Sequence, residues 1–266
     1  MEKFQLDWND FTNTLLSHWQ FSFTVNELKE EFRLSDAAVN QGLYRLLRKK
    51  KIKKIREGFY AVLPPSCRQF GELPMYSYIH HLMQSLGKPY YVGLLTAASL
   101  HGAAHQAPAA EYVFAQYPAP RSIVNRQMPL YFISKKELIA EGIAQKKGEA
   151  GYFNVSSPEL TAFDLLDQIR RFGLDHITTV LQELHEAMKI SALKKMAACN
   201  TISANIQRLG YILENFTEGQ HLTGCLEKIL AKRATFPVPL SPLKANRGKI
   251  DKKWRIIVNT EIAPDL

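Results

Sequence analysis

The sequence is poor in cysteine and lacks a long apolar run. Its 266 residues include three cysteines, Cys67, Cys199 and Cys225, which are far apart and form no CxxC pair. This spacing argues against a disulfide framework or a zinc knuckle and predicts reduced thiols. The longest apolar run, Tyr90–Leu100, has about half of the ~20 residues that a membrane span needs. Because the N-terminus also lacks the apolar core of a signal peptide, we expect a cytoplasmic protein.

Catalytic and metal-binding signatures are also scarce. Ser99 lacks the flanking glycines of a nucleophile elbow, and the sequence contains no glycine-rich phosphate loop. His101 and His105 are one helical turn apart, as a metal pair would be, but no third ligand follows nearby. We therefore expect no catalytic residues, no metal and no cofactor. An enzyme that uses this histidine pair is kept as a minor hypothesis, which metal analysis of the purified protein would test.

Positive charge, in contrast, is concentrated in one stretch. Residues 33–56 hold nine basic residues against a single acid, Asp36, which gives a local charge of +8 in a chain whose net charge is +9. A cluster of this kind predicts a binding surface for a polyanion, and duplex DNA is the commonest such partner.

The first fifty residues have the periodicity of three helices. The first helix has an apolar face that Asp7 can cap, formed by Trp8, Phe11, Leu15 and Trp19. Residues 24–27, Thr-Val-Asn-Glu, form a capping box at the start of a short second helix. Ser35 can cap a third helix that runs to about Lys50. Two short helices joined by a tight turn predict a helix-turn-helix.

The third helix divides into an apolar face and a polar face. At about 100° per residue, the apolar face holds Val39, Leu43, Leu46 and Leu47. Glutamine can pair with adenine and arginine with guanine in the major groove, so we expect the polar face to read bases through Gln41, Tyr44, Arg45 and Arg48. Gly42 costs about 1 kcal/mol in a helix relative to alanine, so we expect a neighbouring element to approach closely there.

A β-hairpin is predicted directly after this helix. Residues 52–56 and 59–63 are β-branched and aromatic runs on either side of Glu57-Gly58. A hairpin in this position is typical of a wing, and its cations would lie along DNA phosphates. The predicted phosphate contacts are Lys49, Lys50, Lys51, Lys53, Lys54 and Arg56. Residues 1–68 are thus predicted to form a winged helix-turn-helix DNA-binding domain.

The remaining residues, 69–266, predict a larger mixed domain, so the expected fold class is α+β. Residues 67–74 have the composition of a linker, and most of residues 89–102 have that of a buried helix. Short runs at 112–117, 130–133 and 151–155 predict a small sheet. Amphipathic segments from the Ser157-Pro158 helix start onward predict a helical bundle.

A second basic patch lies near the C-terminus. Residues 244–255 hold six basic residues and one acid, a local charge of +5, followed by a probable strand at 254–258. The patch consists of Lys244, Arg247, Lys249, Lys252, Lys253 and Arg255. Its charge fits either a solubilising loop or a second binding surface, and the sequence does not decide between them.

The order of these parts resembles that of the AbiEi family, the antitoxins of the AbiE type IV toxin–antitoxin and phage abortive-infection systems. The segments that carry the resemblance span almost the whole chain: Lys51–Tyr60, Tyr90–Gly102, Ser156–Glu159, Asn205–Tyr211 and Lys252–Asn259. These are structural signatures and include no catalytic motif. The basic run from Lys49 to Lys54 is longer than the family pattern requires.

The resemblance implies an N-terminal domain that represses its own operon by binding double-stranded DNA at inverted repeats. It also implies a C-terminal antitoxin and regulatory domain that counteracts a nucleotidyltransferase-like toxin, either by direct contact or indirectly. The alternative is an ordinary winged-helix transcription factor whose C-terminal domain senses a ligand or dimerises. A toxin gene next to this one would favour the antitoxin, whereas a solitary gene and a small-molecule ligand would favour the alternative.

Overall fold

The computed structural model describes residues 7–103, 108–124, 127–200 and 202–263. The chain divides into two compact units, neither of which is one continuous stretch. The first comprises Met1–Tyr90, Ala115–Lys136 and Gln145–Asn154, and the second comprises Tyr91–Phe114, Glu137–Ala144 and Val155–Leu266. The described chain contains both helices and sheets, with a run of helices from Pro158 to Leu230, which confirms a mixed α+β class.

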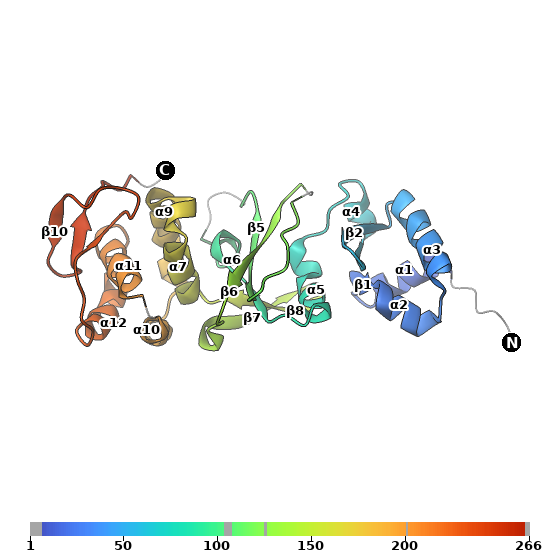
Figure 1. Cartoon of the computed structure of the whole chain (residues 1–266), viewed down its shortest axis with the longest axis horizontal. Helices are drawn as coiled ribbons and strands as arrows, with labels where there is room; N and C mark the ends of the chain where they lie inside the picture. The colour runs from blue at the N-terminus through green and yellow to red at the C-terminus, as the bar shows by residue number, and fades with distance from the viewer. Residues whose placement is uncertain (1–6, 104–107, 125–126, 201, 264–266) are drawn as a thin grey trace. The chain divides into compact units, whose positions relative to one another are not determined.

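The chain begins with three helices and a short strand, drawn in blue in Figure 1: α1 (Trp8–Ser17), β1 (Ser22–Thr24), α2 (Val25–Phe32) and α3 (Asp36–Arg48). Each helix is capped by the predicted side chain. Asp7 accepts a hydrogen bond from the Asn9 amide at 2.7 Å, and Ser35 caps α3. Thr24 and Glu27 form the reciprocal capping box, so two backbone amides at the start of α2 gain partners.

A three-stranded antiparallel sheet follows these helices. Its hairpin consists of β2 (Ile52–Arg56) and β3 (Phe59–Val62), as predicted, and β3 lies in the middle of the order β1-β3-β2. Gly58 in the hairpin turn has φ +72°, a conformation that glycine adopts without strain. The apolar faces of the helices and the sheet enclose a core of Phe11, Phe23, Leu28, Val39, Leu43, Leu46, Ile52, Tyr60 and Val62.

Two residues that were predicted to face this core are exposed instead. Leu47 is 37% exposed, because it lies about 80° around the helix from Val39 and falls at the edge of the buried stripe. Trp19 is 62% exposed. Helix α1 ends at Ser17, and Trp19 has a left-handed φ of 58°, so the chain has already turned away from the helical face.

A five-stranded sheet occupies the middle of the chain, with the order β6-β5-β4-β8-β7. Its strands are β4 (Tyr90–Val92), β5 (Glu111–Gln116), β6 (Leu130–Lys135), β7 (Ile143–Gly148) and β8 (Gly151–Ser156). Short helices come before it and between its strands: α4 (Pro65–Arg68), η1 (Met75–Ser77), α5 (Ile79–Ser85), α6 (Leu94–Leu100) and η2 (Ala140–Gly142).

The last hundred residues form the predicted helical bundle and a small terminal sheet. The helices are α7 (Pro158–Asp167), α8 (Ile169–Phe172), α9 (Leu174–Leu184), η3 (His185–Ala187), α10 (Ile190–Cys199), α11 (Ser203–Asn215) and α12 (Gln220–Leu230). The terminal sheet has the order β10-β11-β9, from β9 (Val238–Pro239), β10 (Lys249–Asp251) and β11 (Ile256–Val258).

Several short elements differ from the sequence-based expectation. The segment predicted as mostly helix from residue 89 begins with strand β4, and helix α6 starts at Leu94. The predicted linker contains the end of α4. Strands β1, β7, β9 and β10 were not predicted, because two or three residues are too few to show alternation and β7 is largely polar. In the described part of the chain, no helix has the length and apolarity needed to cross a bilayer.

Candidate nucleic-acid interface

Helix α3 is held firmly against the N-terminal core. Val39, Leu43 and Leu46 are each less than 5% exposed. On the same side, a Cβ added at Gly42 would overlap the ring of Trp8 from α1. The glycine therefore lets the indole lie directly on the helix backbone, which confirms the predicted close approach. This packing fixes the rotation of α3 and so determines which side chains face outward.

The opposite face of α3 presents the four predicted base-reading side chains to solvent. Gln41, Tyr44, Arg45 and Arg48 are all exposed, and together with Lys49 the last three line a hollow of about 300 Å³. The guanidinium carbon of Arg48 lies 5.9 Å from the centroid of the Tyr44 ring, in cation–π geometry. Among the described residues, Gln41 and Arg45 have no hydrogen-bond or ion-pair partner, so their polar atoms are available to another molecule.

The predicted phosphate-contacting residues fall into two groups. Lys49 and Lys50, just beyond the end of α3, are exposed and have no ion-pair partner within the described ranges. Three others already have partners in the protein: Lys51 donates to Asn9 at 2.9 Å, Lys53 pairs with Glu72, and Lys54 pairs with Glu57.

The hairpin cations are therefore partly neutralised. The hydrogen bond that Lys54 donates to Glu57 raises the pKa of Lys54, which stays charged at neutral pH. Arg56 is half-buried, and its Nη1 atom has no hydrogen-bond partner in the described structure. A phosphate at the hairpin would thus meet cations that are shared with acidic neighbours, whereas at Lys49 and Lys50 it would meet unshared ones.

The second basic patch is exposed on the segment before β10, on β10 itself and on the connection to β11, but half of its members have partners. Lys244 donates to Thr260 at 2.6 Å, and Arg255 donates to the Thr235 carbonyl. Lys253 pairs with Glu214 and with Glu227, the latter at 2.8 Å. Arg247, Lys249 and Lys252 have no ion-pair partner in the part of the chain that the structure describes.

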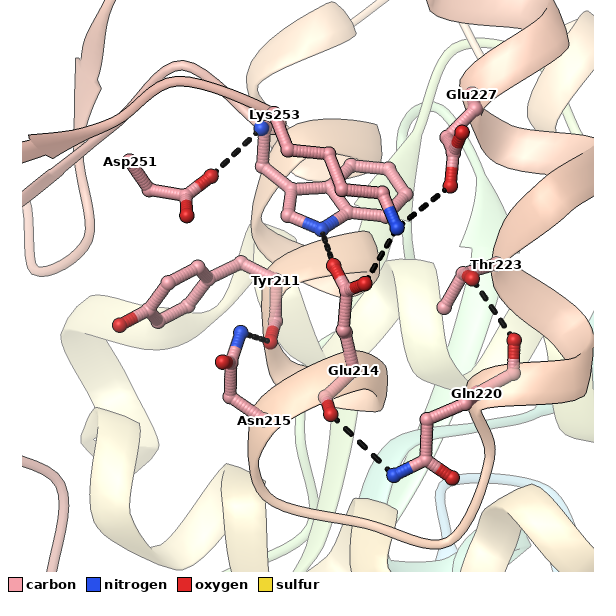
Figure 2. A network of polar contacts seen from close by, with 9 residues as sticks. Tyr211, Glu214, Asn215, Gln220, Thr223, Glu227, Asp251 and Lys253 are labelled. Atoms are coloured by element: carbon pink, nitrogen blue, oxygen red, sulfur yellow. Dashed lines mark hydrogen bonds and ion pairs between the residues drawn. The ribbon is translucent and has the colours of Figure 1, made fainter.

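Figure 2 shows that Lys253 belongs to a polar network that joins α11, α12 and the segment before β11. Glu214 accepts hydrogen bonds from Lys253 and from the indole N–H of Trp254. Burial opposes ionisation of Glu214, but these two hydrogen bonds outweigh it and lower the pKa of the carboxyl group. The hydrogen bonds that Lys253 donates to Glu214 and Glu227 raise the pKa of Lys253. We conclude that Lys253 stabilises the fold of this region.

Two of the sequence segments that carry the family resemblance meet at this place. Gln207 Nε2 donates to the carbonyl of Trp254 at 2.9 Å. A Cβ added at Gly210 would overlap the Trp254 ring, which is 1% exposed. Arg208, buried in the same helix, donates to the Pro239 carbonyl at 3.0 Å. The Asn205–Tyr211 segment thus anchors the Lys252–Asn259 segment. Because the two segments are far apart in the sequence, this contact was not predicted.

The histidine pair considered as a metal site is not formed by the described residues. His101 Nε2 is 2.7 Å from the Ser156 carbonyl oxygen and donates a hydrogen bond to it in that tautomer. His105 lies outside the described residues. Nearby, the Tyr91 hydroxyl donates to Asp164 at 2.9 Å, and burial raises the pKa of Tyr91 well above its usual range. These contacts tie β4 and β8 to the helices of the second unit.

Comparisons with known proteins give a family match and a solved structure of similar fold. Residues 91–215 match the family described as the AbiEi antitoxin C-terminal domain. The crystal structure of the RV2827C protein from Mycobacterium tuberculosis is similar in fold, with a TM-score of 0.67 and 14% sequence identity over 96% of this chain and 92% of that one. A search of curated proteins finds no match in sequence. The family match over residues 91–215 confirms the resemblance to AbiEi antitoxins that was inferred from the sequence.

Proposed function

We propose that this protein is an antitoxin and also a DNA-binding autorepressor. In this proposal, residues 1–68 are a winged helix-turn-helix domain that binds inverted repeats in the promoter of its own operon, and residues 69–266 carry the antitoxin function. The observation that supports it best is the outward face of α3, where Gln41, Tyr44, Arg45 and Arg48 are exposed beside a buried face that fixes their direction.

The chemistry of that face suits sequence reading. An α-helix fits the major groove of B-form DNA, and arginine can make paired hydrogen bonds to the O6 and N7 atoms of guanine. Glutamine can do the same with adenine. Because Gln41 and Arg45 are not engaged within the described protein, binding DNA would not require breaking an internal hydrogen bond.

Phosphate binding would come mainly from the end of α3. Lys49 and Lys50 are unpaired among the described residues, whereas Lys53 and Lys54 exchange their pairing with Glu72 and Glu57 for phosphate contacts. If about six phosphates are neutralised, log affinity should fall with log salt with a slope of about −5.

The antitoxin function is directed at a nucleotidyltransferase-like toxin in this proposal. The family match supports an antitoxin, and the family resemblance supplies the class of toxin. In this proposal the protein needs no catalytic residue, metal or cofactor, and it would counteract the toxin by binding it or by controlling its expression.

A binding assay with the natural promoter tests the DNA half. Arg45→Ala and Arg48→Ala should each weaken operator binding by about 1 to 3 kcal/mol. Arg170→Ala is a matched control, because Arg170 is exposed and lies outside the proposed interface. Equal binding by all three variants and the unaltered protein would reject α3 as the reading element.

Co-expression with the toxin from the same operon tests the antitoxin half. The full chain should relieve the growth arrest caused by that toxin. The Arg45→Ala variant should relieve it as well when both genes are expressed from an unrelated promoter, because the operator is then absent. Failure of the unaltered chain to relieve arrest would reject the antitoxin role toward that toxin.

A further inference from the structure

A pocket of about 410 Å³ opens in the first compact unit, and no residue of α3 lines it. Its walls come from α1, β1 and α2 and from residues 76–84 and 150–152, all of which belong to that unit. This volume is in the range of small-molecule sites. The proposed DNA interface uses none of these residues, and of the lining only residues 150–152 lie within the family match.

Aromatic side chains dominate the wall of the pocket. Trp19, Tyr76 and Tyr152 line it and are exposed, whereas Phe21 lines it and is buried. The rings of Trp19 and Phe21 meet edge to face with centroids 6.3 Å apart. Exposed aromatic rings that gather around one hollow offer flat apolar faces, which bind an apolar or cationic ligand.

The charge of the pocket is opposite to that of the protein. In a chain with a net charge of +9, the described lining includes two carboxylates, Glu27 and Glu31, and neither lysine nor arginine. Glu27 is committed to the protein, since it accepts from the Thr24 amide at 2.7 Å and lies 2.9 Å from His81 Nε2. Glu31 is exposed and has no ion-pair partner among the described residues, so its charge is available to a ligand.

From these features we propose that the pocket binds a small organic cation with a flat apolar body. The body lies against Trp19, Tyr76 and Tyr152, and the ammonium group pairs with Glu31. This site is a separate binding function, and it stands whether or not α3 binds DNA.

Three indole compounds that differ only in their head group test the proposal: tryptamine, which is cationic, tryptophol, which is neutral, and indole-3-acetate, which is anionic. Calorimetric titration of the full chain at about pH 8 keeps histidine neutral and a primary amine charged. Tryptamine should bind saturably, tryptophol about tenfold more weakly, and indole-3-acetate weakest of all. Equal affinity for tryptamine and tryptophol, or no saturable tryptamine binding up to about 10 mM, would overturn the proposal.

Neighbouring glutamates on α2 supply a matched pair of variants. Glu31→Gln should lower tryptamine affinity about tenfold and leave tryptophol affinity unchanged, which also shows that the pocket is intact. Glu30→Gln removes the same charge from an exposed position that does not line the pocket, and should leave both affinities unchanged. An equal loss in the two variants would mean that general surface charge attracts the cation, and would refute a site at Glu31.

Discussion

Two glycines inside helices allow a tryptophan ring to lie directly on the helix backbone. Gly42 lies under the Trp8 ring and Gly210 under the Trp254 ring, and at both positions a methyl group would overlap the indole. In each case the glycine is inside a helix, where alanine would otherwise be preferred. The loss of helix propensity is offset by the burial of a large aromatic ring against the backbone.

Replacing Gly42 with alanine should therefore destabilise the protein by about 1 to 3 kcal/mol, because the Trp8 ring must move. Gly224→Ala is the matched control. Gly224 is also inside a helix, but nothing lies within 4 Å of a Cβ at that position, so alanine there should stabilise by up to about 1 kcal/mol. Urea unfolding of both variants measures the difference. A Gly42→Ala variant as stable as Gly224→Ala would show that Trp8 does not pack on α3.

Glu214 holds the segment before β11 by accepting hydrogen bonds from Lys253 and from the Trp254 indole. Glu214→Ala should cost about 1 to 3 kcal/mol, since the buried Trp254 indole N–H loses its acceptor, whereas Glu214→Gln keeps an acceptor and should cost about 1 kcal/mol or less. The two variants separate the hydrogen bond from the ion pair with Lys253. Equal losses in thermal unfolding would assign the whole effect to charge.

The lowered pKa of Glu214 predicts that the stability of the protein depends on pH. The pKa of Glu214 in the folded protein is below its ordinary 4.5, so its ionisation stabilises the fold fully above that pH and this contribution is lost as the pH falls through the lowered value. The stability difference between the unaltered protein and Glu214→Gln should therefore shrink as the pH falls below about 4.5, which unfolding curves between pH 3 and pH 7 would show. A difference that does not change with pH would contradict the lowered pKa.

At the scale of elements, local signals were predictable and distant contacts were not. The capping box at Thr24, the Ser35 cap and the hairpin were all predicted correctly, because each depends on residues within a few positions of one another. The pairing of Lys53 with Glu72 depends on chain segments that sequence alone does not bring together. For the same reason, the sequence identified the side chains on the outward face of α3 but neither the partners of the hairpin lysines nor the aromatic pocket.

The basic residues between positions 33 and 56 should contribute unequally to DNA binding, because some of them already pair with acidic residues of the protein. Lys53→Ala removes a charge that Glu72 already shares, whereas Lys49→Ala removes an unshared one. We expect Lys49→Ala to weaken binding to every duplex and to reduce the salt slope by about one, and Lys53→Ala to have a smaller effect. Titrations at several salt concentrations measure both. A larger effect from Lys53 would show that its pairing with Glu72 does not persist on DNA.

For the whole molecule, the family match and the charge distribution point to different parts of the chain. The antitoxin domain match covers residues 91–215, whereas the strongest basic stretch is at residues 33–56. We therefore propose that DNA binding and antitoxin activity belong to separate segments of one protein. Variants on α3 should remove the first activity and spare the second.

The proposal that α3 reads the DNA sequence is best tested by measuring the binding specificity of the protein. The measurement is the ratio of affinities for the operator and for a scrambled duplex of equal length, in the unaltered protein and in Arg45→Ala and Lys49→Ala. Arg45→Ala should lower the ratio by about tenfold, and Lys49→Ala should weaken both duplexes and keep the ratio unchanged. An unchanged ratio in Arg45→Ala would show that α3 does not read the DNA sequence through this residue, and would contradict the central claim.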